Sequence, residues 1–282
     1  MNIRLIALDL DGTLLDSQKH LPERNKKAIE ACIARDIYVV PCTGRTVKGI
    51  PEAVTEISGI RYGIMVNGGV LVDMQEKRIL EERLIPPQTA VEIYRMISGN
   101  HVMCDAYIQG DGFSERYCFD HMDEYGLPDV IQELVKRTRE PVDNVAEYIR
   151  TRNDMVDKLN LYFDSAQERE DVRRRLEQRG DVLVSSSFWF NLEVNGPGAS
   201  KGEGIVRLAK ILGVKPEETM AFGDGENDLS MMEKVGVSVA MENGETFVKE
   251  KADYIAPSND DAGVGQMLER LILSDAFAKR SL

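Results

Sequence analysis

Two aspartates follow the first apolar run of the chain. Residues 3–8 are typical of a buried β-strand, and Asp9 and Asp11 come directly after it, with Gly12 next. Burying charge is costly, and open α/β sheets bind ligands at the carboxyl ends of their strands. Two neighbouring carboxylates can hold a hard cation, share a proton, or divide the roles of nucleophile and acid. A solvated Asp-Gly turn is the alternative without chemistry.

The next apolar run, residues 37–40, is followed by Thr43, Gly44 and Arg45. A hydroxyl, a backbone that can approach a ligand closely and a cation suit the oxygens of a phosphate group. An ordinary turn with a solvated Arg45 is the alternative. A third run, residues 63–66, leads to Asn67, a further polar side chain at a strand end.

Lys201 stands at the predicted start of a helix over residues 202–212. A cation opposes the dipole at a helix N-terminus, so this position favours an anion nearby, and a lysine extended into solvent is the alternative. The surrounding glycines resemble a nucleotide phosphate loop, but the order Gly-Lys-Ser/Thr is missing. The sequence therefore argues against a nucleoside triphosphate site.

Acidic residues crowd after another predicted strand, residues 220–222. Asp224, Glu226, Asn227 and Asp228 follow within six positions of it, and a divalent cation would relieve the repulsion between the carboxylates. Their spacing does not match an EF-hand. Asn227 or Asp228 could instead cap the helix that follows, although capping would explain one side chain and not the group.

The elements that must position these residues alternate between strand and helix. Helices are expected over residues 22–35, 47–57, 202–212, 229–235 and 245–251, with strands at 3–8, 37–40, 63–66, 220–222, 237–240 and 254–255. This alternation predicts an α/β fold with a Rossmann-like parallel sheet.

The pattern of polar and apolar residues changes between about residue 83 and residue 190. Longer polar helices are expected there, over 87–97 and 166–178, with a strand at 159–163. We predict a core domain formed by residues 1–82 and 191–282, interrupted by an inserted α+β domain over residues 83–190. The last residues, 276–282, are expected to form a frayed end.

The composition of the chain argues against several classes of partner and site. The net charge of −13 argues against nucleic acid or an anionic membrane as a partner. The four cysteines and three histidines lack metal-binding spacing, and the cysteines are expected to be reduced thiols. No run has the length of a membrane span and no secretory leader is recognisable. We therefore expect a soluble, cytoplasmic protein, as a monomer or a weak homodimer.

The order of these residues resembles the haloacid dehalogenase superfamily of phosphohydrolases. Asp9, Asp11 and Thr13 match its first motif, Thr43 its second and Lys201 its third. Gly223, Asp224, Asn227 and Asp228 match its fourth motif. The run over residues 191–194 and the segments at 239–244 and 252–260 are similar to the Cof-type branch, which includes sugar-phosphate phosphatases, and the insert resembles the larger α/β cap of that superfamily.

The resemblance implies a Mg²⁺-dependent phosphatase acting on a small phosphorylated metabolite such as a sugar phosphate. Asp9 would be the nucleophile that forms an aspartyl-phosphate, and Asp11 would be the acid and base. Mg²⁺ would be held by Asp9, the backbone carbonyl of Asp11 and Asp224, with support from Asp228. The resemblance also assigns phosphate binding to Thr43, Gly44, Lys201 and Asn227, and makes Arg45 and Asn67 candidates for contacting the substrate.

Two other functions remain compatible with the motifs. A phosphomutase could pass the phosphoryl group from Asp9 to another sugar hydroxyl. A non-catalytic metabolite-binding or regulatory protein could keep the fold, although such a protein is expected to have lost an acid or Lys201. An ion-pumping ATPase is excluded by the absence of apolar runs that could span a membrane.

Overall fold

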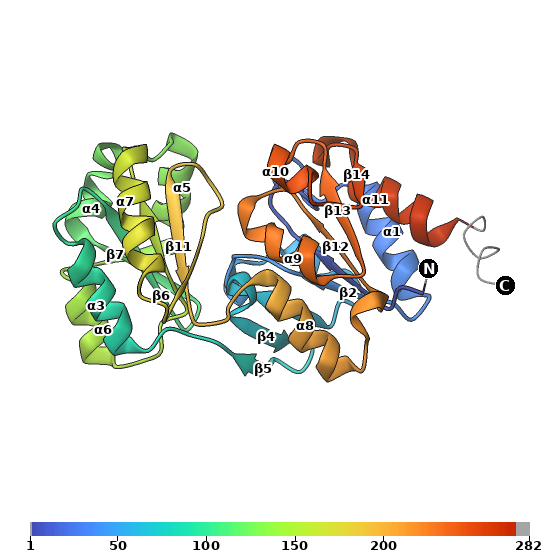
Figure 1. The fold of residues 1–282 in the computed structure, drawn as a ribbon, viewed down its shortest axis with the longest axis horizontal. Helices are drawn as coiled ribbons and strands as arrows, with labels where there is room; N and C mark the ends of the chain where they lie inside the picture. Colours follow the sequence, from blue (N-terminus) through green and yellow to red (C-terminus); the bar gives the residue numbers. More distant parts are fainter. Residues whose placement is uncertain (1, 275–282) are drawn as a thin grey trace. The chain divides into compact units, whose positions relative to one another are not determined.

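The computed structural model describes residues 2–274, which form two compact units (Figure 1). Unit 1 contains the residues up to 45, residues 49–82 and the chain from residue 200. Unit 2 contains residues 46–48 and 83–199. The N-terminal and C-terminal parts of the chain, blue and orange-red in Figure 1, therefore build one unit together. The predicted frayed end at 276–282 lies outside the described residues.

Five parallel strands form the central sheet of unit 1, which confirms the predicted α/β fold with a parallel-sheet core. In spatial order they are β14 (Tyr254–Ala256), β13 (Val237–Met241), β12 (Thr219–Gly223), β1 (Leu5–Leu8) and β2 (Tyr38–Pro41). The N-terminal strand β1 thus pairs with β12, which comes after unit 2 in the sequence.

Helices cover both faces of this sheet. Alternate residues of β1 point to opposite faces, so that Ile6 and Leu8 pack into one core and Leu5 and Ala7 into another. The first core is shared with α1 and α11, which lie side by side in Figure 1, and the second with α8 and α9. The helices of unit 1 are α1 (Glu23–Ile33), α2 (Glu52–Thr55), α8 (Lys201–Leu212), α9 (Leu229–Lys234), α10 (Thr246–Lys249) and α11 (Gly263–Leu268).

The third predicted strand is not a member of the parallel sheet. It forms β3 (Tyr62–Met65), which pairs antiparallel with β4 (Val70–Asp73), and β4 pairs with β5 (Arg78–Glu82). One isolated parallel bridge, Cys42 to Ile64, connects β3 to the end of β2. The prediction that the third strand is a member of the parallel sheet was therefore wrong. β3 meets the end of β2 in this parallel bridge, but the tight turn after β3 returns the chain directly and pairs it antiparallel with β4.

The predicted helix over residues 47–57 is also different in the structure. A single turn of 3₁₀ helix at Val47–Gly49 is separated from α2 by Pro51, the N-cap of α2. Proline lacks a backbone N–H and clashes with the preceding turn, so a continuous helix cannot pass through this position.

Unit 2 is an α+β sandwich of one six-stranded sheet and covering helices. Its sheet runs β10 (Leu183–Ser185), β11 (Asn191–Asn195), β9 (Lys158–Tyr162), β6 (Met103–Ile108), β7 (Asp111–Glu115) and β8 (Arg139–Val142). Its helices are α3 (Pro87–Ile97), α4 (Arg116–Asp120), α5 (Asp129–Thr138), α6 (Val145–Arg152) and α7 (Ala166–Glu177). The structure extends unit 2 beyond the predicted end at residue 190, because β11 pairs with β9 and β10.

The two faces of the unit 2 sheet differ in polarity. One face packs its apolar side chains against α3, α6 and α7. The other face carries buried charged pairs, including Lys158 with Glu193 (Nζ to Oε1, 2.5 Å) and Arg139 with Asp105 (Nε to Oδ2, 3.0 Å). Buried charges are stable only when they are paired, and within each of these pairs the two opposite charges compensate each other.

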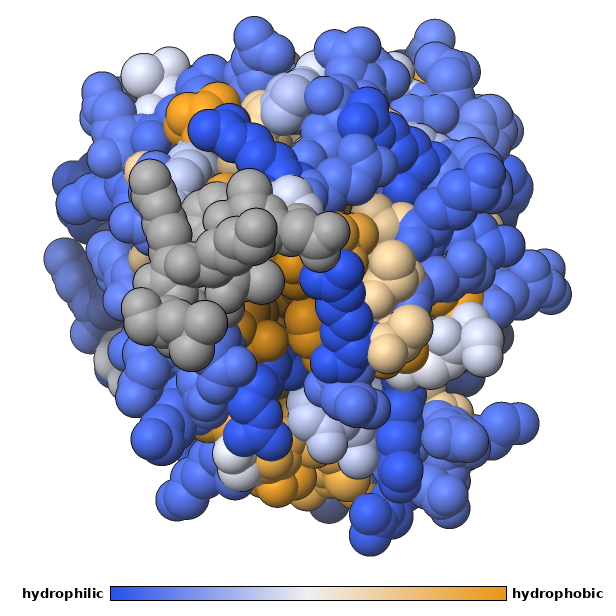
Figure 2. All heavy atoms as spheres, turned by 90° about the vertical axis from the view of Figure 1, so that its right-hand side faces the viewer, coloured by the Kyte–Doolittle hydropathy of each residue, from blue (hydrophilic) through white to orange (hydrophobic). Residues whose placement is uncertain are grey.

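The surface of unit 1 on the side of α1 and α11 is mainly hydrophilic, with small apolar areas between charged side chains (Figure 2). This appearance agrees with the 29% of charged residues in the chain. None of the helices within residues 2–274 has both the length and the apolar character needed to cross a membrane.

Candidate active site

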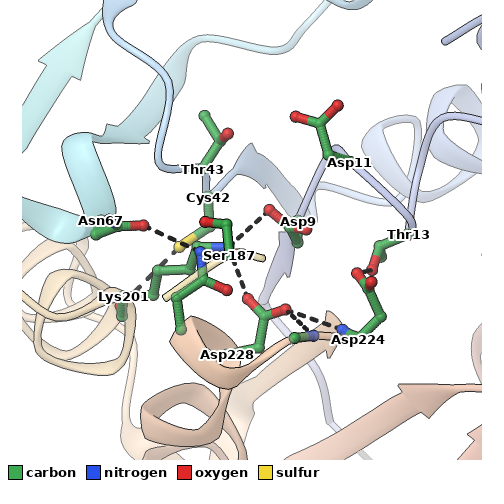
Figure 3. A network of polar contacts seen from close by, with 12 residues as sticks. Asp9, Asp11, Thr13, Cys42, Thr43, Asn67, Ser187, Lys201, Asp224 and Asp228 are labelled. Carbon is green, nitrogen blue, oxygen red and sulfur yellow. Dashed lines mark hydrogen bonds and ion pairs between the residues drawn. The ribbon is translucent and has the colours of Figure 1, made fainter. Parts of the chain in front are cut away.

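Polar side chains from four segments of unit 1 meet at the carboxyl edge of the parallel sheet (Figure 3). Asp9 and Asp11 follow β1 and Thr43 follows β2. Lys201 begins α8, and the segment from Asp224 to Asp228 follows β12. Because β1 lies between β2 and β12, the parallel order of the sheet brings these segments together although they are far apart in the sequence.

Lys201 is fully buried and bridges two carboxylates. Its Nζ donates to Asp9 Oδ1 at 2.6 Å and to Asp228 Oδ1 at 2.7 Å. Burial alone would lower the pKa of Lys201, but Asp228 and Asp9 outweigh it and hold that pKa well above its usual range. The anion expected beside this helix start is thus supplied by the protein itself. The alternative of a solvated lysine was wrong.

Asp228 also fixes the loop after β12. Its Oδ2 accepts hydrogen bonds from the backbone N–H groups of Asp224, at 2.9 Å, and Gly225, at 3.0 Å. It stands at the N-cap of α9, where its side chain makes no capping hydrogen bond. Capping of α9 therefore does not explain this acid, which instead ties the acidic loop to Lys201.

Three of the acids form one group with the spacing of a metal site. Within residues 2–274, Asp9, Asp224 and Asp228 each offer a carboxylate oxygen, and these oxygens lie within 4.8 Å of one another. Burial raises the pKa of Asp9 well above its ordinary value, against the effect of Lys201. Burial, and next the Asp228 carboxylate, raise the pKa of Asp224 to about 7. Buried oxygen ligands that repel one another fit a hard divalent cation such as Mg²⁺.

The turn that follows the two aspartates of the first motif leaves room for Asp224. Gly12 has a φ of +82°, and a Cβ at this position would lie 2.3 Å from Asp224 Oδ2. Only glycine satisfies both conditions. Thr13 Oγ1 donates to Asp224 Oδ1 at 2.7 Å. Thr13 of the first motif therefore orients the Asp224 carboxylate.

The side chain of Asp11 does not join the acidic group. In Figure 3 its carboxylate points away from Asp9. Arg45 donates to it twice, from Nε to Oδ2 at 2.8 Å and from Nη2 to Oδ1 at 2.7 Å, and Lys19 Nζ lies 2.8 Å from Oδ1. Burial would raise the pKa of Asp11, but the hydrogen bonds and charges of Arg45 and Lys19 together hold it well below its ordinary value.

Sequence reasoning did not identify Lys19, because its place depends on a local turn. The Asp16 carboxylate accepts from the backbone N–H groups of Gln18 and His20, and Lys19 between them has a φ of +64°. An aspartate that bonds the backbone two residues ahead is the available sequence signal, and it predicts the turn but not the partner of Lys19.

The remaining predicted site residues line the same edge. Thr43 is buried, and its Oγ1 accepts from the backbone N–H of Arg45 at 3.2 Å across Gly44. Asn227 Nδ2 donates to Asn67 Oδ1 at 3.2 Å, so these two amides join the loops after β12 and β3. Hydroxyl, amide and ammonium groups beside a buried carboxylate are the donors that a tetrahedral oxyanion requires.

Comparison with known proteins places this arrangement in a family. The family model described as haloacid dehalogenase-like hydrolase matches residues 6–268. The chain is 27% identical over 276 residues to a 5-amino-6-(5-phospho-D-ribitylamino)uracil phosphatase of Bacillus subtilis, with 97% of each chain covered. It is 26% identical over 272 residues to a pyridoxal phosphate phosphatase of Escherichia coli, covering 95% of this chain and 98% of that protein.

A solved structure agrees with these relatives. A haloacid dehalogenase-like hydrolase from B. subtilis superposes with a TM-score of 0.82 at 28% identity, covering 96% of this chain and 100% of the other. The match extends over both units of the chain. The chain therefore belongs to the haloacid dehalogenase-like hydrolases and is an enzyme of their phosphatase type.

Proposed function

We propose that this enzyme hydrolyses a small phosphomonoester, of the sugar-phosphate class or a related metabolite, through an aspartyl-phosphate on Asp9. The observation that carries the proposal is the buried Asp9 carboxylate, held at 2.6 Å by Lys201 beside the carboxylates of Asp224 and Asp228. A carboxylate fixed in this way has one orientation in which to attack. The phosphatase relatives in the family support this assignment.

Asp9 attacks phosphorus in the first step, and the bond between phosphorus and the ester oxygen breaks as the new bond forms. Lys201 keeps the Asp9 carboxylate in place through its hydrogen bond to Oδ1. The chain as a whole carries a net charge of −13, so an anionic substrate needs local positive charge. The Lys201 ammonium supplies part of it beside the acidic residues of the site.

Asp11 carries the protons of the reaction. As an acid it protonates the leaving alkoxide, and as a base it then deprotonates the water that cleaves the aspartyl-phosphate. The ion pairs with Arg45 and Lys19 favour its ionised form, which is the form of the base. Acting as the acid requires that the Asp11 carboxyl leave these two cations and take up a proton.

The acidic group fits Mg²⁺, held by the Asp9 carboxylate, the backbone carbonyl of Asp11 and Asp224, with Asp228 in support. The bound ion would supply positive charge that offsets the repulsion between Asp9 and an anionic substrate.

The phosphate oxygens are held by the Thr43 hydroxyl, the Gly44 backbone, Lys201 and the Asn227 amide. Arg45 and Asn67 stand next to this set, because Arg45 follows Gly44 and Asn67 contacts Asn227 at 3.2 Å. Both are therefore proposed as substrate contacts. In the chain order unit 2 separates the second motif from Lys201, and it is proposed as the cap that reads the leaving group. The enzyme is proposed to act in the cytoplasm as a monomer or weak homodimer.

The test is a screen of phosphate release from sugar phosphates, nucleotides and cofactor phosphates, with Mg²⁺ and with a chelator. Release from a set of small esters that requires the metal and is lost in Asp9→Asn supports the proposal. Isomerised sugar phosphate without free phosphate would identify a mutase instead. Metabolite binding without either product would identify a non-catalytic protein.

A further inference from the structure

Three consecutive buried residues after β3 adopt left-handed backbone conformations. Val66, Asn67 and Gly68 have φ values of 54°, 51° and 89°. A β-branched residue such as Val66 rarely adopts a positive φ, because its side chain clashes with its own backbone. Such strain persists only where the surrounding structure enforces it, and it gathers at functional sites.

One set of restraints comes from the loop of the second motif. The backbone N–H of Val66 donates to the carbonyl of Arg45, and that of Asn67 donates to the carbonyl of Thr43, both at 3.0 Å. The turn and the Thr43 loop therefore hold each other in a fixed register.

The other restraint comes from α8, the helix that begins with Lys201. The guanidinium of Arg207 donates a hydrogen bond to the Gly68 carbonyl. Its Nε also lies 3.4 Å from Glu81 Oε1. Ser200 packs so closely on the turn that a Cβ at Gly68 would lie 2.1 Å from its carbonyl oxygen. The turn is thus clamped between α8 and the Thr43 loop.

The clamped turn presents Asn67 to the fourth motif, where its Oδ1 accepts from Asn227 Nδ2 at 3.2 Å. We propose that Arg207 is a positioning residue, which holds the Gly68 carbonyl and thereby keeps the strained turn in the conformation that aligns Asn67 and Asn227 for the substrate phosphate. Arg207 acts through the turn and not by contact with the substrate. This inference rests on the proposed function, because it assumes that the aligned amides bind a phosphoryl group.

A double-mutant cycle tests this chain of contacts. Arg207→Met and Asn67→Ala are each expected to raise KM and the inhibition constant of inorganic phosphate roughly tenfold, with a smaller effect on kcat. The double variant should be no worse than Asn67→Ala alone, because both changes remove the same alignment. Effects that add in the double variant, or a Ki for phosphate unchanged in Arg207→Met, would overturn the proposal.

Glu81→Gln is the matched control, because it alters a second partner of Arg207 and leaves the bond to Gly68. It should keep the wild-type KM and phosphate Ki, and a tenfold rise in this control would also contradict the proposal. Should Arg207→Met fail to fold, Arg207→Lys carries the test. Its shorter reach should raise the phosphate Ki in a folded protein, and an unchanged Ki would count against the clamp. A wild-type enzyme that neither releases nor binds phosphate would contradict the proposed function itself.

Discussion

The Arg45 guanidinium donates hydrogen bonds to both carboxylate oxygens of Asp11, at 2.8 Å to Oδ2 and 2.7 Å to Oδ1. This forked geometry is the strongest pairing available to a carboxylate, and Lys19 adds a second cation at 2.8 Å. The acid and base of the proposed mechanism is therefore held ionised and apart from the nucleophile. In the proposed mechanism the substrate phosphate competes for the Arg45 guanidinium, which would free Asp11 to take up a proton.

The two roles of Asp11 can be separated by the choice of ester. Asp11→Asn should lose roughly 10²- to 10⁴-fold in turnover of a sugar phosphate, whose alkoxide leaves poorly without a proton. With p-nitrophenyl phosphate, whose leaving group needs little help, the first step should survive while cleavage of the aspartyl-phosphate stays slow. Rapid-mixing kinetics should then show a burst of one nitrophenol per enzyme. Equal losses for both esters with no burst would remove Asp11 from this role.

Much of this site could be predicted from the sequence, because strand ends are marked by a change from apolar to polar residues. Asp9 and Asp224 follow β1 and β12 directly, and Thr43 follows β2 after one intervening residue. Neighbouring parallel strands place their ends together. The helix that begins at Lys201 could similarly be predicted from helical periodicity, and in the structure the Ser200 side chain caps it.

The rest depended on contacts that periodicity does not record. The residues of a short apolar strand do not specify which strand it pairs with. β3 was therefore assigned to the parallel sheet, whereas it pairs antiparallel with β4. The pairing of Arg45 with Asp11 was also not predicted, since a long side chain selects its partner only in the folded chain. Lys19 reaches Asp11 because the local turn at Asp16 directs it there, and no spacing rule predicts that contact.

Replacing Lys201 should affect both stability and turnover. Lys201→Met leaves the buried carboxylates of Asp9 and Asp228 without their cation, which should lower the free energy of unfolding by roughly 3–5 kcal/mol in a chelator. It should also lower kcat/KM by about 10²- to 10³-fold. Thermal unfolding and steady-state kinetics measure the two effects. Lys210→Met, on the exposed side of the same helix, should change neither, and similar behaviour of the two variants would refute the role of Lys201.

The acidic group should make stability depend on pH in the absence of metal. The pKa of Asp224 is raised from 3.8 to about 7, so the folded state holds its proton more tightly than the unfolded state does. The stability that protonated Asp224 contributes to the folded state is fully present below the pKa of the unfolded state. It is lost as pH rises through about 7. In a chelator, the melting temperature of the wild type should fall relative to that of Asp224→Asn between about pH 4 and about pH 7.

Added Mg²⁺ should reverse this loss at the upper end of the range, because the cation replaces the proton on the carboxylates. Asp224→Asn should gain less from Mg²⁺ than the wild type gains. A difference between the two proteins that is independent of pH, together with an equal response to Mg²⁺, would show that Asp224 neither titrates nor holds the metal as described.

Two glycine substitutions separate backbone strain from damage to the site. Gly213 has a φ of +66° with no atom within 4 Å of an added Cβ, so Gly213→Ala should cost about 1–2 kcal/mol and leave activity intact. Gly12→Ala carries the same strain and places its methyl group 2.3 Å from Asp224 Oδ2. It should displace that carboxylate and lose Mg²⁺-dependent activity. Measured kcat values that are equal in the two variants would contradict this account of the first motif.

The central claim is that the phosphoryl group passes through Asp9. The most direct measurement traps the intermediate by mixing Asp11→Asn with p-nitrophenyl phosphate and Mg²⁺, quenching with borohydride, and sequencing the N-terminal peptide by mass spectrometry. Residue 9 should be reduced from aspartate to homoserine only when substrate is present, and Asp9→Asn in the same background should show no such product. Nitrophenol release without modification of Asp9, or modification at another residue, would contradict this claim.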